Sequence, residues 1–371
     1  MLLLIPGPVQ TRPEVRAAMA VDIAPWDDDF RVEHAALRER LLRIAGGTPG
    51  EHTVLPVTGA GHAVVEACLR TFVPAGGKVL IPANGTYALR MVRLAREAGR
   101  VPVTLEVPDT RPVRAEEVAA ALAADPAIGH VGMVYSETGS GIVNDPEAIG
   151  AVVRAAGRRL IVDAVSAFGA LPFRMDAHPE CDALAFTTGK CLEGMPGIGI
   201  AVARIDRLTA CAGQAGSWVL DLAAIHEYAL SNGPGRHRFT PAVQVLRALG
   251  VALDFYEQEG GQPARLARYA ENARVLYEGV QSLGLTPYLE WRHQGPVIVT
   301  VHQPPDPAFT LPGFVAALKA RGVLISNFFN TTAPTFRVGC IGTVTPADMR
   351  VAVEAMRGAL DSLGVRQRAA A

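Results

Sequence analysis

The sequence predicts an α/β protein in which a large domain, built on a mostly parallel sheet flanked by helices, precedes a smaller C-terminal α+β domain. Three observations lead to this prediction. The chain has 371 residues, which is more than one small domain needs. Short apolar runs alternate with helical patterns along most of its length, as they do in parallel sheets. Hydrophobic residues make up 49% of the chain, which is sufficient for a sizeable core.

The strands expected in the large domain are mostly continuous apolar stretches. A strand covered by helices on both faces buries both sets of its side chains, so its sequence does not alternate. Helices rich in Ala, Arg and Glu separate the strands, for example at 114–124 and 146–156. The expected strands lie at 53–57, 79–81, 101–103, 131–135, 160–162 and 183–186.

A long helical pattern over 241–259 and 263–283 leaves this layer and leads to the second domain. Further apolar runs at 297–301, 323–325 and 335–338, with helical patterns at 314–320 and 346–363, predict the α+β unit. We expect residues 21–260 to form the large domain and 261–371 the small one. Residues 1–20 are expected to pack near the functional site and the small domain.

Composition excludes several classes of function. A net charge of −1 gives no reason to expect nucleic acid or an anionic membrane as a partner. No segment approaches the roughly 20 apolar residues of a membrane span, and the N-terminus lacks the pattern of a secretory signal. The five cysteines are scattered and form no CxxC or Cys/His cluster. We therefore expect reduced thiols, no metal site and a cytoplasmic location.

A glycine-rich turn, Thr58-Gly59-Ala60-Gly61-His62-Ala63, follows the first strand and opens a helix. Backbone amides at a helix N-terminus bind phosphate, and glycine lets the anion approach closely. The stretch matches a dinucleotide-binding fingerprint only in part, and it lacks the GK[ST] of a P-loop. An ordinary tight turn would have the same composition.

Two further polar segments follow strand ends, where ligands of open α/β sheets bind. Asn84-Gly85-Thr86-Tyr87 offers an aromatic ring that could stack on a flat ligand, or a tyrosine that merely packs. The stretch from Ser136 to Gly141 contains Thr138 and fits a ligand-lining loop as well as an ordinary connection.

Asp163 and Lys190 are the most informative pair. Asp163 closes a buried strand, where an ionised carboxylate needs a cation or strong hydrogen bonds. A protonated pyridine nitrogen meets that need, although Asp163 could instead cap the following turn. Lys190 lies among Thr, Gly, Cys and Leu, whereas most lysines are solvated. Desolvation lowers the pKa of a lysine, as Schiff-base chemistry requires.

Arg337 occupies an apolar strand of the small domain, in Thr335-Phe336-Arg337-Val338-Gly339. This position fits bidentate capture of a carboxylate or phosphonate. A structural salt bridge is the alternative interpretation.

Together these segments resemble class V, fold-type I aminotransferases that depend on pyridoxal 5'-phosphate, over nearly the full length. Within the class, the chain is most similar to the 2-aminoethylphosphonate–pyruvate transaminases. Two stretches point to that subfamily, namely Pro25-Trp26-Asp27-Asp28-Asp29-Phe30 and the segment from Gly189 to Gly197. The other shared stretches are Ile5–Val9, Asn84–Tyr87, Asp163–Gly169, Arg238–Thr240 and Phe336–Gly339.

The resemblance implies a role for each candidate residue. Lys190 would form the Schiff base with the cofactor, Asp163 would pair with its pyridine nitrogen, and Arg337 would hold the acidic end of the substrate. Thr240 would reach the phosphate of the neighbouring subunit's cofactor, so a homodimer would share its active sites. The remaining cofactor contacts implied by the resemblance are Ala60, Gly61, His62, Tyr87, Thr138, Ser166 and Thr188.

The reaction implied by the resemblance moves the amino group of 2-aminoethylphosphonate to pyruvate, giving phosphonoacetaldehyde and alanine. Two segments depart from that subfamily. Ala60-Gly61-His62 replaces a Ser-Gly-Thr-type turn and is similar to alanine–glyoxylate aminotransferases. The segment from Ser326 to Asn330 replaces a Tyr-Pro-Gly-Lys-like run. A transaminase of alanine or serine with glyoxylate, and a catalytically silent binding protein of the same fold, are therefore the alternatives. A cysteine desulfurase would need a mobile reactive cysteine, and Cys340 lies in an expected strand and turn.

Overall fold

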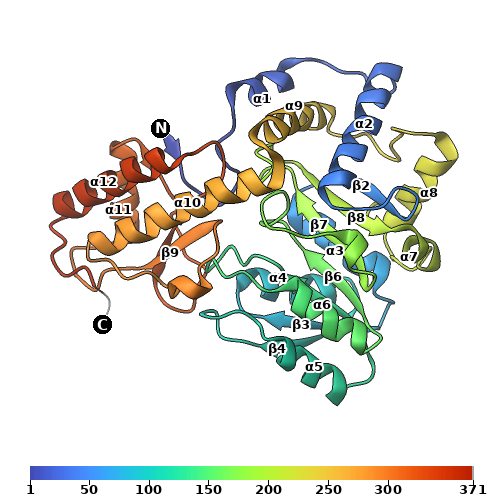
Figure 1. Ribbon diagram of the computed structural model, residues 1–371, viewed down its shortest axis with the longest axis horizontal. Coiled ribbons are helices and arrows are strands. Elements are labelled where there is room, and N and C mark those ends of the chain that lie inside the picture. The colour runs from blue at the N-terminus through green and yellow to red at the C-terminus, as the bar shows by residue number, and fades with distance from the viewer. Residues whose placement is uncertain (370–371) are drawn as a thin grey trace.

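The computed structural model describes residues 1–369, which form a large α/β layer and a smaller α+β layer connected by the long helix α10 (Gly261–Ser282) (Figure 1). The large layer contains a seven-stranded sheet with the strand order β2-β8-β7-β6-β5-β3-β4. Its strands are β2 (His52–Thr58), β3 (Lys78–Ala83), β4 (Val101–Glu106), β5 (Ile128–Val134), β6 (Arg159–Asp163), β7 (Cys181–Thr187) and β8 (Ile198–Arg204).

All six strands predicted for this domain are present, and the predicted α/β fold class is confirmed. The structure adds β8, which runs antiparallel to both β2 and β7 in an otherwise parallel sheet. This strand was not predicted from the sequence. The strand has a glycine at position 199 because a Cβ there would lie 2.7 Å from the Val64 side chain. The helix that carries Val64 therefore packs directly on the backbone of β8.

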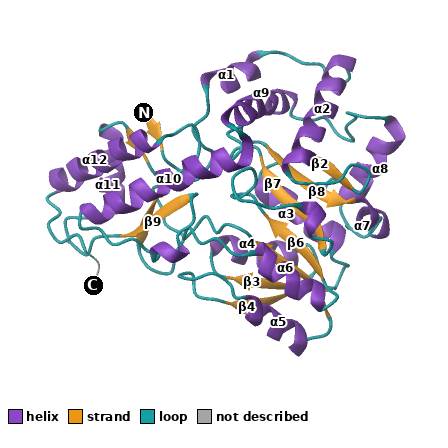
Figure 2. Cartoon of the chain, in the orientation of Figure 1, coloured by secondary structure: helices purple, strands orange, loops and turns teal. Residues whose placement is uncertain are grey.

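Helices cover both faces of the sheet, as the continuous apolar strands require (Figure 2). Apolar residues from the two faces form two separate clusters, and every strand of the sheet except the edge strand β4 contributes to both. The helices of this layer are α2 (Asp28–Ile44), α3 (Gly61–Phe72), α4 (Thr86–Glu97), α5 (Ala115–Ala124), α6 (Pro146–Ala155), α7 (Ile205–Ala210), α8 (Leu222–Asn232) and α9 (Val243–Glu259).

The carboxyl ends of the central strands meet at one edge of the sheet. In register, Val134 of β5 pairs with Asp163 of β6, and Asp163 pairs with Ala185 of β7. The chain leaves these three strands through the polar segments singled out in the sequence. This edge is where ligands of open α/β sheets bind.

The smaller layer contains the antiparallel strands β9 (Ile298–His302) and β11 (Thr335–Gly339), packed against α11 (Leu311–Ala320) and α12 (Pro346–Leu363). The N-terminal strand β1 (Leu2–Leu3) pairs in parallel with β10 (Val323–Leu324). One core cluster joins Leu4 to residues 273–365. We therefore propose a domain boundary near residue 260. The first residues pack with the small domain. Short helical segments, α1 (Pro13–Ala17) among them, lead from there to the large layer.

Glu193 connects the turn after β7 to α10. Its backbone is left-handed, with φ 57°, which is uncommon for a residue other than glycine. The side chain is 4% exposed, and its Oε1 accepts hydrogen bonds from Arg268 Nη2 at 2.6 Å and Tyr269 OH at 2.7 Å. Arg265 lies 3.4 Å from the same oxygen. This buried carboxylate therefore fixes the segment that contains Lys190.

Arg268 extends the connection to the small domain. Its Nη1 donates hydrogen bonds to the carbonyl oxygens of Gly342 at 2.7 Å and Val344 at 2.9 Å. The loop after β11 and the turn after β7 are thus held by a single guanidinium. Among residues 1–369, no helix is long and apolar enough to cross a membrane.

We expect Glu193→Gln to lower the free energy of unfolding by about 2 kcal/mol, because it removes one of the two carboxylates, Glu193 and Glu259, that pair with Arg265 and Arg268. The control is Glu354→Gln, which removes the charge of a carboxylate whose ion pair with Arg357 has partners 69% and 45% exposed. That change should cost less than about 1 kcal/mol. Urea unfolding measures both, and equal shifts of the two variants would contradict the assignment of Glu193 as the anchor.

Candidate active site

A cavity of about 240 Å³ opens at the carboxyl edge of the sheet and contains both Lys190 and Asp163. Its wall combines the starts of α3 and α4, the ends of β6 and β7, and the N-terminal segment at Gly7 and Pro8. Other lining residues are Ala60, Gly61, His62, Val65, Tyr87, Arg90, Met91, Leu94, Val165, Thr187, Gly189 and Pro196.

Lys190 lies in the turn after β7 and has no salt bridge to any described carboxylate. Burial lowers the pKa of its amine to about 8, while the neighbouring Cys191 and Asp163 raise it and Arg337 lowers it further. The N-terminal segment packs directly on the side chain. Gly7 has φ 142°, and a Cβ at this position would lie 2.9 Å from Lys190 Cε. Glycine is therefore required there for the lysine to keep its place.

Asp163 ends β6 and faces the same cavity. Its Oδ1 accepts a hydrogen bond from Val165 N at 2.9 Å. Burial raises the pKa of this carboxyl to about 6, although that hydrogen bond and Lys190 both lower it. A buried carboxylate that is not ion-paired favours a cationic ligand group. The structure thus brings together the two residues that sequence reasoning paired.

Tyr87 begins α4 and places its ring beside the lysine. The ring centre is 5.9 Å from Lys190 Nζ and 4.8 Å from the Cζ atom of Arg90. The sequence predicted Tyr87 but not Arg90, whose helical spacing of three residues puts it on the same helix face.

Glu137 is a second residue that sequence reasoning missed. It is fully buried, and its carboxylate accepts the backbone N–H groups of Tyr87 at 3.1 Å, Ala88 at 3.2 Å and Gly139 at 3.3 Å. Burial raises the pKa of Glu137 to about 7. A carboxylate at a helix N-terminus interacts favourably with the helix dipole. Glu137 therefore fixes the start of α4 and with it the position of Tyr87.

The N-terminus of α3 forms another part of the wall, at Ala60, Gly61 and His62. Its N-cap, Ala60, has no side chain that could accept a hydrogen bond from the first turn. These amides are free to bind an anion. A Cβ on Gly61 would lie 2.7 Å from the Val165 side chain, so Val165 packs closely against this turn. Val165 was also missed, because an apolar residue after a strand carries no chemical signal.

Three predicted cofactor contacts lie next to the cavity without lining it. The hydroxyls of Thr138 and Ser166 are 2.6 Å apart and hydrogen-bond to each other. Thr188 donates its hydroxyl to Met195 O, so it holds the turn around Lys190 rather than facing the cavity. A contact of Thr188 with the cofactor stays a prediction.

Arg337 projects from β11 of the small domain and is 2% exposed. Its Nη1 donates to Thr138 O at 3.0 Å. The Nε atom is buried and has no hydrogen-bond partner, and no described carboxylate forms a salt bridge with the guanidinium. The structural salt bridge considered for Arg337 is therefore not formed among residues 1–369. Arg337 does not itself line the Lys190 cavity, and its role in binding substrate stays a prediction.

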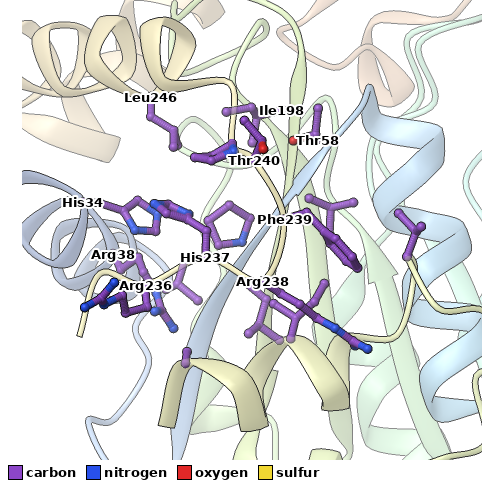
Figure 3. A pocket seen from close by; sticks show the side chains of 18 residues that line it. His34, Arg38, Thr58, Ile198, Arg236, His237, Arg238, Phe239, Thr240 and Leu246 are labelled. Atoms are coloured by element: carbon purple, nitrogen blue, oxygen red, sulfur yellow. The ribbon is translucent and has the colours of Figure 1, made fainter. Parts of the chain in front are cut away.

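Thr240 does not reach the Lys190 cavity within one chain. It lines a separate cavity of about 110 Å³, together with His34, Arg236 and His237 (Figure 3). The segment that carries it precedes α9 and lies near Trp218, whose ring contacts Phe239, and Val219, which lines the same cavity; these two residues are 73% and 52% exposed. Thr240 and Lys190 therefore line different cavities of the same chain.

Comparison with known proteins agrees with this geometry. Residues 34–305 match the family model described as aminotransferase class-V. The chain is 44% identical to the 2-aminoethylphosphonate–pyruvate transaminase of Burkholderia pseudomallei, over 99% of this chain and 98% of the relative. The corresponding protein of Burkholderia thailandensis is 45% identical over the same shares.

Two solved structures share the fold over almost the whole chain. The pyridoxamine–pyruvate aminotransferase of Mesorhizobium loti superposes with a TM-score of 0.89 and 26% identity, covering 99% of this chain and 93% of that one. An alanine–glyoxylate aminotransferase from Nostoc sp. gives a TM-score of 0.87 and 25% identity, covering 97% and 95%.

The amine of Lys190 should react as a free base at lower pH than an ordinary lysine. Its pKa is lowered from 10.5 to about 8, so the reactive neutral form appears as pH rises through about 8. The chain has two other lysines, Lys78 and Lys319, and both can be replaced by arginine. In that variant without cofactor, the rate of amine labelling at residue 190, followed by mass spectrometry, should have its midpoint near 8. A midpoint near 10.5 would contradict the burial argument.

Proposed function

Because the chain belongs to the class V aminotransferase family, we propose that it binds pyridoxal 5'-phosphate and transfers the amino group of 2-aminoethylphosphonate to pyruvate, giving phosphonoacetaldehyde and alanine. The observation that carries this proposal is one cavity containing an amine of lowered pKa, an unpaired buried carboxylate and an uncapped helix N-terminus. The substrate assignment is supported by the names of relatives that are 44% and 45% identical over 99% of the chain.

The residues present fit the cofactor. Asp163 would hold the pyridine nitrogen in its protonated form, because its carboxylate lacks another cation. Tyr87 and Val165 would contact the ring, and the amides at Gly61 and His62 would bind the phosphate. Lys190 would supply the amine for the covalent link. When bound, pyridoxal phosphate supplies an electrophilic carbon and a ring that accepts the electron pair of a broken C–H bond.

The protein's contribution is proton transfer and positioning. The Nζ atom of Lys190, with its pKa of about 8, exists partly as the free base near neutral pH. It can therefore take a proton from the substrate carbon and deliver it to the cofactor side, a proton shift between two carbon atoms. Asp163 would hold the proton on the pyridine nitrogen of the cofactor while Lys190 moves the other proton. Glu137 holds the helix start from which Tyr87 extends, so the flat ligand keeps its orientation.

Arg337 would bind the acidic end of each substrate. The donor carries a phosphonate and the acceptor a carboxylate, and both ends must face the same cation while their reacting carbons face Lys190. A guanidinium whose Nε is buried without a partner suits this role, since leaving the group unpaired costs free energy that an anion recovers.

We also infer a homodimer with shared active sites. Thr240 lies outside the Lys190 cavity of its own chain, on a segment bordered by exposed apolar side chains. A second copy packed there would bury these side chains and bring Thr240 to the neighbouring cofactor's phosphate. A reduced, cytoplasmic environment is consistent with the free state of all five cysteines.

A transaminase of alanine or serine with glyoxylate remains the second candidate. The observation that favours it is the Ala60-Gly61-His62 turn, which lacks the hydroxyls of a Ser-Gly-Thr-type turn. Retention of both Lys190 and Asp163 in one cavity disfavours a silent binding protein, because ligand binding alone does not need a neutral amine.

The purified protein with pyridoxal phosphate should show an absorption band near the visible edge, which arises from the covalent link to Lys190. The variant Lys190→Ala cannot form this link and should lack the band. Mixing the loaded protein with 2-aminoethylphosphonate alone should convert the band completely, and pyruvate should restore it. Alanine and serine with glyoxylate are the comparison substrates. Turnover of those two alone would refute the phosphonate assignment, and a protein without any such band would refute the cofactor assignment.

A further inference from the structure

The loop of residues 326–334 connects β10 to β11 and borders the anion-binding side of the site. None of its nine residues is charged. Two adjacent aromatic side chains, Phe328 and Phe329, are 51% and 41% exposed. Exposed aromatic residues beside a ligand site are typical of a surface that contacts the ligand or its binding groups.

Phe328 lies on the face of the arginine that would bind the substrate. Its ring centre is 4.7 Å from Arg337 Cζ, within the range of a cation–π contact. Among the described residues, Phe329 has no such contact with a cation. One face of the guanidinium is therefore covered by an apolar ring, and water is excluded from it.

The same loop limits which edge of Arg337 remains free. The Nη1 atom donates to Thr138 O at 3.0 Å. With the amide of Asn330 oriented so that its oxygen faces Arg337, that oxygen accepts from the same nitrogen at 3.2 Å. The buried Nε has no partner. The Tyr87 hydroxyl also pairs with the guanidinium. Nε is therefore the buried nitrogen that an anion could accept a hydrogen bond from.

The loop is anchored to the large domain at two points. The carbonyl oxygen of Asn330 accepts a hydrogen bond from Thr86 Oγ1 at 2.8 Å, at the start of α4. Asp109, in the connection after β4, accepts from Thr332 N at 2.8 Å and from Tyr288 OH at 2.7 Å. These hydrogen bonds fix the loop that contains Phe328, and the bond to Thr86 fixes it next to Tyr87 at the start of α4.

We propose that Phe328 is a specificity-determining residue, which selects small anionic substrates by covering one face of Arg337. Excluding water strengthens the attraction between one guanidinium and one anionic group, and the uncharged loop adds no second cation. The fitting groups are a phosphonate or a carboxylate, whose oxygen would accept a hydrogen bond from Arg337 Nε. This inference rests on the proposed function, because it assigns Arg337 to the substrate.

The test compares wild-type protein, Phe328→Ala and Phe329→Ala, each loaded with pyridoxal phosphate. The donors are 2-aminoethylphosphonate, which carries the anionic group, and propylamine, which has a similar length without it. Steady-state rates give KM and kcat for the first donor. Single-turnover absorbance changes give the rate of the amine half-reaction for both donors.

Phe328→Ala should raise the KM for 2-aminoethylphosphonate about tenfold, which corresponds to about 1.4 kcal/mol, and leave kcat within twofold. The half-reaction with propylamine should be unchanged, since no anion is bound. Phe329→Ala, the matched control, should stay within twofold of wild type with both donors. Phe328→Leu keeps an apolar cover without an aromatic face, and its KM should lie between those of wild type and Phe328→Ala.

The proposal is overturned if Phe328→Ala behaves like wild type, if both phenylalanine variants lose affinity equally, or if propylamine is affected in the same proportion. A wild-type protein that reacts with no amine would instead refute the proposed function.

Discussion

The structure depends on keeping a lysine amine and a carboxylate close together, yet unpaired, in one buried cavity. Two oppositely charged groups this deeply buried would normally form an ion pair to offset their desolvation. Lys190 and Asp163 do not, because Asp163 ends β6, Lys190 lies in the turn after β7, and other contacts fix the segment around each residue. Gly7 packs against the lysine side chain, and Val165 N donates to the carboxylate. Burial without an ion pair favours the neutral form of each group, so it lowers the pKa of Lys190 and raises the pKa of Asp163.

Rigid supports outside the cavity keep this arrangement in place. Glu193 adopts a left-handed backbone and binds three side chains of α10, which fixes the turn behind the lysine. Glu137 does the same for the start of α4. Both are buried carboxylates that accept several hydrogen bonds from the protein, whereas Asp163 accepts one, from Val165 N. The site therefore combines carboxylates used for structure with one that is kept for a ligand.

Most of the sheet and the central pair could be predicted from the sequence, because buried strands have continuous apolar runs and charged residues at their ends are rare. The helix at 346–363 was predicted to the residue, since Thr345 and Asp348 form a capping box. β8 was missed because glycines inside a strand have the pattern of a turn. Glu137 was missed because its partners are backbone amides of another segment, which no sequence pattern indicates. Val165 and Phe328 act through shape and position, which only the folded chain defines.

The position of the first residues has a consequence for synthesis of the protein. Leu2 and Leu3 pair with Val323 and Leu324, and Gly7 contacts Lys190. The residues that leave the ribosome first must wait for more than three hundred others before their partner strand exists. Until then β1 stays unpaired. Such contacts between distant parts of a chain form slowly and expose an unpaired edge. The active site is therefore completed only after translation is almost finished.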